Sequence, residues 1–323
     1  MRKVLIMNQG IDDVFNADPI ARMEGIDCYV RDDYFWRELG RDETITLIEL
    51  SRKIGWRKAV LTLQNKGVTK YITDPTRLSF IDLLTIKKGA RILDLGAGWG
   101  SLSMQIAKRF PTTFVYALDM TLEGLLFLDI VTKQQELTNL RIAKVGADKI
   151  PLVDESMDVV LMIGVLEWVG ESITRMKPGA AQLAVLAEAK RALKKGGHLV
   201  IGIENRYSYK YLRGKPEHSH IRFGSVLPKS LVTLYSRSVR KKEYRTYIYS
   251  LGEYARILGK AGYEDLHFYG AYPDYRFPRV IADLGSMHEF WKDAHAPGSS
   301  LLKHLPNGFL KRIVPSYFIV ARK

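Results

Sequence analysis

The sequence predicts an α/β protein built on a doubly wound, seven-stranded sheet with an antiparallel edge strand. Two observations predict this fold: short apolar runs alternate with amphipathic stretches from residue 90 onward, and a glycine-rich turn directly follows the first run. Such alternation is typical of parallel strands covered by helices on both faces. Strands are expected at residues 91–95, 113–118, 140–145, 157–163, 198–203, 265–269 and 317–321, the last two forming an antiparallel pair.

Helices are expected between and around these strands, at residues 101–109, 122–137, 179–193 and 251–260. Apolar side chains recur at spacings of three and four between Glu43 and Gln64, which predicts an N-terminal helical cap over 1–73. Asp74 followed by Pro75 indicates the start of a helix over 78–86.

The main domain is expected over residues 74–323, with insertions at about 205–250 and 273–315. The second insertion is rich in Pro, Gly and His and shows no periodicity, so an irregular loop is expected there.

The composition favours a cytoplasmic protein that can bury a full core, as one large domain or as one domain with an appendage. No apolar run reaches the roughly 18 residues of a membrane-spanning helix, and the basic N-terminus has too few apolar residues for a secretory signal. Cys28 is the only cysteine, so no internal disulfide can form. No Cys/His spacing indicates a metal site, and none is expected. We interpret Cys28 as a packing residue.

The charge is concentrated in one segment. The chain carries a formal net charge of +14, and residues 205–250 hold eleven Lys and Arg against two Glu. Such an excess favours an anionic partner, which can be a nucleic acid, a phospholipid surface or a phosphorylated substrate.

A ligand-binding turn is expected directly after the first strand. Gly96, Gly98 and Gly100 stand at alternate positions there, which permits a tight turn with bare backbone facing a ligand. The dinucleotide version of this turn would need glycine where the chain has Ser101. Asp119 ends the next strand, where an acid can accept hydrogen bonds from both ribose hydroxyls of a nucleoside.

The glycine turn belongs to a longer series of motifs. Together with 91–103 and Asp119, residues 146–158, 164–169 and 193–199 resemble, in order, the motifs of class I S-adenosylmethionine-dependent methyltransferases, a Rossmann-like family. Further segments resemble methyltransferases that occur with bacterial glycan assembly enzymes; these are 34–36, 55–57, 203–206, 249–251, 261–263 and 273–275.

The resemblance implies an enzyme that uses S-adenosylmethionine. It would methylate a small-molecule or saccharide acceptor, at a hydroxyl on an anionic substrate that is phosphorylated or lipid-linked. Two alternatives stay open. Basic side chains interleaved with tyrosines also suit RNA, although no RNA-binding module or Asn-Pro-Pro-Tyr signature is present. A non-catalytic S-adenosylmethionine-binding protein is the other alternative. No transmembrane segment is expected, and peripheral contact with a membrane surface stays open.

The resemblance also implies the cofactor contacts. Gly96, Ala97 and Gly98 would pass under the methionine part, Asp119 would hold the ribose and Met120 would lie against the adenine. Ala147 would offer its backbone amide to the ring. The family often has an acid just before that alanine, whereas this chain has Gly146 there and Asp148 after it, so Asp148 is the candidate for the adenine amino group. The remaining expected cofactor residues are Asp94, Gly100 and Gly164.

Candidate bases follow from the chemistry. Methyl transfer from a sulfonium is an in-line displacement, in which positioning contributes up to ~7–11 kcal/mol and a base for a hydroxyl adds roughly 10²–10⁴-fold. His218 and His220 are the first candidates, because they follow a strand end and histidine titrates near neutral pH; the alternative is that they are solvated loop residues. Glu204 is the third candidate, or else a structural acid that pairs with Arg206 or caps the following segment.

Overall fold

The computed structural model describes residues 14–32, 38–295 and 305–323. The segment 34–36, which contributes to the resemblance at the N-terminal end, lies outside the described residues. The chain divides into two compact units: the first is drawn from 1–73, 86–159 and 191–194, and the second from 74–85, 160–190 and 195–323. The predicted domains, 1–73 and 74–323, stay a prediction.

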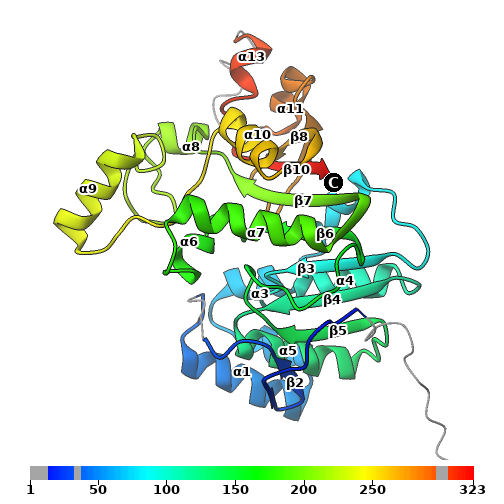
Figure 1. Ribbon diagram of the computed structural model, residues 1–323. Helices are drawn as coiled ribbons and strands as arrows, with labels where there is room; N and C mark the ends of the chain where they lie inside the picture. The colour runs from blue at the N-terminus through cyan, green and yellow to red at the C-terminus, as the bar shows by residue number, and fades with distance from the viewer. Residues whose placement is uncertain (1–13, 33–37, 296–304) are drawn as a thin grey trace, which may run out of the picture. The chain divides into compact units, whose positions relative to one another are not determined.

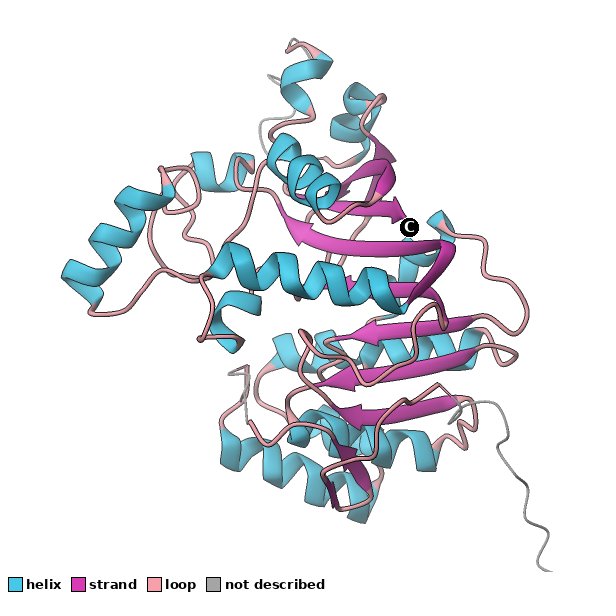
Figure 2. Ribbon diagram, viewed as in Figure 1, coloured by secondary structure: helices cyan, strands magenta, loops and turns pink. Residues whose placement is uncertain are grey.

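Three parallel strands form the centre of the first unit. β3 (Arg91–Leu95), β4 (Phe114–Asp119) and β5 (Leu140–Lys144) lie in the order β5-β4-β3. They are almost wholly buried, as their apolar sequences predict. α4 (Ser101–Arg109) leads from β3 to β4, and α5 (Leu122–Gln134) leads from β4 to β5 (Figures 1 and 2). Because the strands are parallel, all three end at the same edge of the sheet.

The N-terminal region is only partly helical. α1 (Arg41–Ile54), α2 (Trp56–Thr62) and α3 (Lys66–Thr73) cover the stretch where helical periodicity was found. Two strands precede them: β1 (Ala21–Met23) pairs antiparallel with β2 (Ile26–Cys28), and β2 runs parallel to β5. Strands of three residues are too short to show alternation, so sequence patterning missed them.

The second unit contains the antiparallel part of the sheet. Its strands follow the order β6-β7-β10-β8-β9, and the division between the units runs through β6 (Met157–Ile163) and β7 (Leu193–Glu204). β10 (Ser316–Arg322) pairs antiparallel with both β7 and β8 (Glu264–Tyr272), and β9 (Val280–Asp283) pairs antiparallel with β8. The predicted antiparallel pairing of the last two strands is therefore confirmed, but β9 and not β10 lies outermost.

The expected number of strands was wrong. The described residues hold ten strands and not seven, because β1, β2 and β9 were not predicted. The helix expected over 78–86 is instead a 3-10 helix, η1 (Pro75–Leu83), whose start is capped as expected by the Asp74 side chain, which accepts from the Thr76 amide at 2.9 Å.

The helices of the second unit were predicted only in part. α7 (Pro178–Ala192) and α10 (Leu251–Lys260) match the predicted helices. The expectation of an irregular loop over 273–315 was wrong in part, because the described residues there include β9, α11 (Met287–Asp293) and α13 (Asn307–Leu310). Three further helices were not predicted: α6 (Val169–Ser172), α8 (Tyr209–Leu212) and α9 (Lys229–Arg240). Within the described ranges, no helix is long and apolar enough to cross a membrane.

Candidate active site

The glycine turn after β3 has a backbone conformation in which other residue types would be strained. Gly96, Gly98 and Gly100 have φ values of 82°, 54° and 71°, in the left-handed region that favours glycine. A Cβ on Gly100 would lie 2.2 Å from Cδ1 of Leu128 on α5. The amides of Gly96 and Ala97 both donate to the Leu118 carbonyl of β4, at 2.8 and 3.2 Å. The turn is therefore fixed against the neighbouring strand.

Asp119 at the end of β4 holds the same turn. Its Oδ2 accepts from the Gly98 amide at 2.8 Å, and its Oδ1 accepts from the Thr121 amide at 2.7 Å. Burial raises the pKa of Asp119, while these amide donors act to lower it. Each carboxylate oxygen can accept a second hydrogen bond, and the side chain is partly exposed. The carboxylate is therefore positioned to accept bonds from two vicinal hydroxyls such as those of a ribose.

The other expected cofactor residues of the first unit lie near these strand ends. Met120 is partly exposed beside Asp119, and Ala147 and Asp148 are partly exposed in the turn after β5, which the Lys149 amide closes onto the Gly146 carbonyl at 3.2 Å. Asp94 is buried within β3 and accepts from Ser103 Oγ of α4 at 2.5 Å, so it also has a structural role. All these residues remain candidates for cofactor contact.

Gly164 lies in the second unit, directly after β6. It has a φ of 75°, and a Cβ at this position would lie 2.7 Å from Tyr275 Oη. The need for glycine here is thus explained by the packing of Tyr275, and a cofactor contact of Gly164 stays a prediction.

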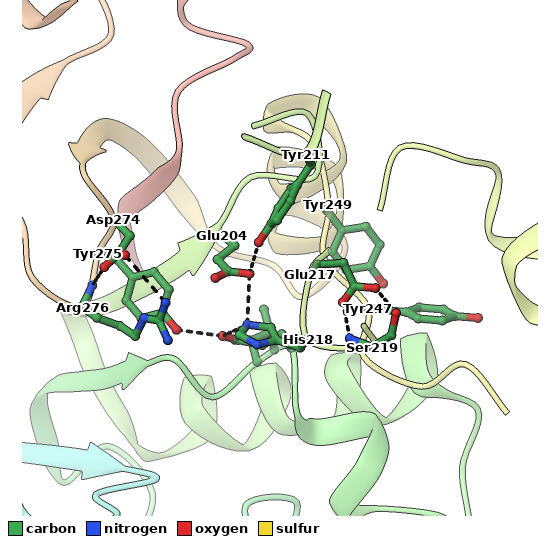
Figure 3. Close-up of polar contacts among 12 residues, drawn as sticks. Glu204, Tyr211, Glu217, His218, Ser219, Tyr247, Tyr249, Asp274, Tyr275 and Arg276 are labelled. Carbon is green, nitrogen blue, oxygen red and sulfur yellow. Dashed lines mark hydrogen bonds and ion pairs between the residues drawn. The ribbon is translucent and has the colours of Figure 1, made fainter. Parts of the chain in front are cut away.

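Two of the three predicted catalytic residues meet in the second unit. Glu204 ends β7 and is buried; its Oε2 accepts from Tyr211 Oη at 2.5 Å and lies 3.0 Å from His218 Nε2 (Figure 3). Burial alone would raise the pKa of Glu204, but the contacts with His218 and Tyr211 outweigh it and lower the pKa to about 2. Burial alone would lower the pKa of His218, and Glu204 reverses this, so the pKa is raised. The two groups form a carboxylate–imidazolium pair.

A second acid completes this cluster. Glu167 follows β6 and is fully buried; its Oε1 accepts from Tyr275 Oη at 3.0 Å and lies 4.0 Å from His218 Nε2. Its Oε2 has no hydrogen-bond partner among the described residues. Burial raises the pKa of Glu167 to about 7, although the charge of His218 acts to lower it. The sequence placed Glu167 after a strand end, but no pattern in it indicates that two acids share one histidine.

A cavity of about 250 Å³ opens onto this cluster. Its wall includes His218, Glu204 and Trp168, whose ring centroid lies 4.6 Å from that of His218. His220 also lines the cavity, but it is exposed and makes no side-chain hydrogen bond or ion pair with the described residues. The other charged lining residues are Lys210, Lys215, Arg276, Glu217 and Asp274. Cations and acids are therefore nearly balanced around the cavity.

Much of the basic segment 205–250 has a structural role. Arg206 is buried, donates to the carbonyls of Ser225 and Leu227 at 2.8 Å each, and pairs with Glu253 at 2.9 Å. The proposed pairing of Arg206 with Glu204 was therefore wrong. Arg245 donates to the Ile173 and Met176 carbonyls at 3.1 and 2.5 Å. Only Lys210 and Lys215 of this segment's eleven cations line the cavity. The charge count in the sequence therefore overstated the number of cations that an acceptor in the cavity can contact.

The chain is similar to known methyltransferases over part of its length. Residues 86–226 match the family model described as a methyltransferase domain, which is less than half of the chain. The malonyl-[acyl-carrier protein] O-methyltransferase of Xylella fastidiosa (strain M23) is 27% identical over 147 residues, covering 45% of each chain. The enzyme of the same name from Methylococcus capsulatus is 32% identical over 110 residues, covering 34% of this chain and 36% of the relative. The chain thus matches less than half the length of these curated relatives.

Solved structures of similar chains are more distant. A phosphoethanolamine N-methyltransferase 2 of Haemonchus contortus in complex with S-adenosylmethionine is 15% identical, with a TM-score of 0.49, and covers 90% of this chain and 61% of its own. A crystal structure of a methyltransferase of Bacillus halodurans is 15% identical, with a TM-score of 0.43, and covers 76% of this chain and 98% of its own.

The family match falls on the part of the chain that carries the glycine turn, Asp119 and the later motifs. The prediction of a methyltransferase is confirmed at the level of this domain, since residues 86–226 match a methyltransferase domain.

Proposed function

We propose that this chain transfers a methyl group from S-adenosylmethionine to a hydroxyl oxygen of a small-molecule acceptor, with His218 as the general base. The observation that carries the proposal is the position of His218 at the wall of a cavity, with Nε2 held 3.0 Å from the Glu204 carboxylate. Buried ionisable groups whose pKa values are shifted in opposite directions are typical of acid–base sites.

The first unit supplies the residues for the cofactor. Its strand ends offer bare glycine backbone and the free acceptor positions of Asp119, which fit the methionine and ribose parts of S-adenosylmethionine. The bound cofactor supplies an electrophilic methyl group. β3 and β4 carry these residues at their carboxyl ends, where ligands of doubly wound sheets bind.

The second unit supplies the proton acceptor. A hydroxyl is a weak nucleophile and must lose its proton as the new carbon–oxygen bond forms. In neutral His218 the ring proton on Nε2 faces the Glu204 carboxylate, so the acceptor's proton would be taken up at Nδ1, and the imidazolium that results is stabilised by Glu204. Glu204 and Glu167 are positioning residues here, since both act through His218. His220 has no such partner, so we assign it no role in proton transfer.

The cavity favours a small acceptor. Its volume of about 250 Å³ lies below the ~300–1,000 Å³ of a pocket that encloses a drug-sized ligand. Lys210, Lys215 and Arg276 offer contacts for one anionic group, which supports an acceptor that carries a phosphate; we propose a phosphorylated or lipid-linked saccharide as its class. The near balance of charges in the wall argues against a polyanion such as RNA. We place the activity in the cytoplasm.

The names of the relatives support a second candidate function, methyl transfer to the carboxylate of malonyl-acyl carrier protein. A carboxylate is already a nucleophile and needs no base. The two candidates therefore differ in their need for His218.

An acceptor panel distinguishes them. The purified protein would be incubated with methyl-tritiated S-adenosylmethionine and with phosphorylated monosaccharides, their unphosphorylated counterparts, or malonyl-acyl carrier protein. We expect label in a hydroxyl-bearing acceptor, with His218→Gln lowering the rate by roughly 10²–10⁴-fold. Methylation of malonyl-acyl carrier protein at an equal rate in both proteins would overturn the hydroxyl assignment.

A further inference from the structure

Helix α9 of the second unit buries one face and exposes an apolar one. Val232 and Ser236 are buried and face the unit, where Val232 packs in a small cluster with Ile221 and Tyr244. Four large side chains are between 50 and 64% exposed: Leu231, Leu234, Tyr235 and Val239. In Figure 1 the helix lies at the left, apart from the strands of its unit.

The exposed apolar residues form one stripe. The pairs 231/234, 231/235 and 235/239 are three or four residues apart, which places Leu231, Leu234, Tyr235 and Val239 on one side of the helix, next to the face that carries Val232 and Ser236. Phe223 and Leu227, just before the helix, are exposed as well. Single exposed leucines are ordinary, but a contiguous apolar face on a solvent-exposed helix indicates an interaction surface.

The same segment is strongly cationic. Residues 228–242 contain five basic residues and no acidic one. Lys229 is directed inward, with Nζ 3.5 Å from the ring centroid of Tyr249, and the other four lie at the C-terminal end of the helix and are exposed. Arg237 pairs with Glu243 and Arg240 donates to the Ser219 carbonyl, which fixes two of these cations in place. The surface thus combines an apolar stripe with an excess of positive charge, which favours a partner that is both apolar and anionic.

We propose that α9 binds the surface of an anionic lipid bilayer, lying in the plane of the interface with its apolar stripe inserted. An amphipathic helix of this kind buries its apolar face roughly 5–10 Å into the headgroup–acyl boundary, while Lys and Arg contact anionic headgroups. Tyr235 within the stripe is of a type enriched at membrane interfaces. This inference does not depend on the proposed methyl transfer.

A single fluorescent label tests insertion directly. Cys28 is buried, the only cysteine of the chain, and burial raises the pKa of its thiol, so a new exposed cysteine can be labelled selectively. Leu234→Cys would carry an environment-sensitive fluorophore, and Leu61→Cys on α2, which is 65% exposed, is the matched control. We expect phosphatidylglycerol vesicles to shift the emission of the label at position 234 to the blue, with no shift at position 61 and none with phosphatidylcholine vesicles.

Vesicle co-sedimentation gives a second, independent measurement. The triple variant Leu231→Ser, Leu234→Ser, Val239→Ser should bind phosphatidylglycerol vesicles at least tenfold more weakly, whereas the control Ile45→Ser, Ile54→Ser, Leu61→Ser, also at exposed positions, should bind like the wild type. Lys241→Ser with Lys242→Ser should weaken binding by about 25-fold, or about fivefold per charge. Unchanged thermal unfolding and unchanged S-adenosylmethionine affinity would show that each variant is folded.

Three results would overturn the proposal. They are equal emission shifts at positions 234 and 61, equal vesicle binding by the two triple variants, and a shift at position 234 caused by acyl carrier protein but not by vesicles. The last result would make the surface a docking site for an acidic protein.

Discussion

Glu167 and Glu204 should affect stability in opposite directions when each is replaced by glutamine. Both are buried, and their pKa values of about 7 and about 2 depart from the ordinary 4.5 by about 2.5 on either side. A difference of that size corresponds to about 3 kcal/mol of unfolding free energy. Glutamine keeps the shape of each side chain and can still accept from Tyr275 or Tyr211.

The direction of each change in unfolding free energy follows from the linkage between protonation and folding. The folded pKa of Glu204 is lowered, so its stabilisation is present above pH 4.5 and is lost as the pH falls toward about 2. The folded pKa of Glu167 is raised, so its ionisation destabilises the fold increasingly as the pH rises from 4.5 to about 7. At about pH 8, Glu204→Gln should therefore lower the unfolding free energy by about 3 kcal/mol, and Glu167→Gln should raise it by a similar amount.

Urea unfolding at about pH 8 and about pH 5 measures both effects. The gain from Glu167→Gln should largely disappear at the lower pH, because Glu167 is then protonated in the wild type. Glu289→Gln, at an exposed position on α11, should change stability by less than about 0.5 kcal/mol at either pH. A loss of stability in Glu167→Gln at about pH 8 would refute the reasoning, since it would show that the ionised carboxylate stabilises the fold.

Three further outcomes follow from the geometry. Asp119→Ala should weaken S-adenosylhomocysteine binding by roughly 1.5–3 kcal/mol, or about 10- to 150-fold, when measured by calorimetry against the exposed-site control Asp154→Ala; affinity within twofold of the wild type would remove Asp119 from the site. Gly100→Ala and Gly89→Ala both place alanine at positive φ, but only at position 100 would the new Cβ clash with another side chain, that of Leu128. Gly89→Ala should therefore cost about 1–2 kcal/mol in urea unfolding and Gly100→Ala about 1–3 kcal/mol more, and equal losses would contradict the close packing of the turn on Leu128. Arg240→Ser, Lys241→Ser, Lys242→Ser should leave the affinity for a small acceptor unchanged across a salt series, because none of the three lines the cavity; steep, variant-sensitive binding of generic RNA would instead favour the nucleic-acid alternative.

Local sequence patterns predicted the centre of the fold well. β3, α4, β6 and α10 have the predicted bounds, because a buried apolar run or a clear helical period marks each of them. β1, β2 and β9 were missed, since strands of three or four residues are defined by their partners and not by their own sequence. The 3-10 form of η1 was missed for a related reason: its cap at Asp74 is a local signal, but its hydrogen-bond pattern is not.

The candidate site was only partly predictable. The glycine turn and Asp119 are adjacent to strand ends, so spacing alone indicated them. Glu204 and His218 were both candidates, but their contact is made by a loop that no period describes. Glu167 was not chosen, because its raised pKa depends on burial beside groups distant in sequence. Arg206 and Arg245 counted as free charges in the sequence, whereas the fold uses them to bind backbone carbonyls.

The central claim is that His218 accepts the acceptor's proton, and the pH dependence of methyl transfer tests it most directly. The rate with saturating tritiated S-adenosylmethionine would be measured against pH for the wild type, Glu167→Gln and His218→Gln. Since Glu204 raises the pKa of His218, the wild-type rate should climb with pH through a value above the ordinary 6.5 and then level off. Glu167→Gln removes a carboxylate that lies 4.0 Å from His218 Nε2, so the pKa of His218 should fall and the rise should move to lower pH. His218→Gln should abolish the rise together with most of the rate. A rise at the same pH in all three proteins, with His218→Gln nearly as fast as the wild type, would contradict the account.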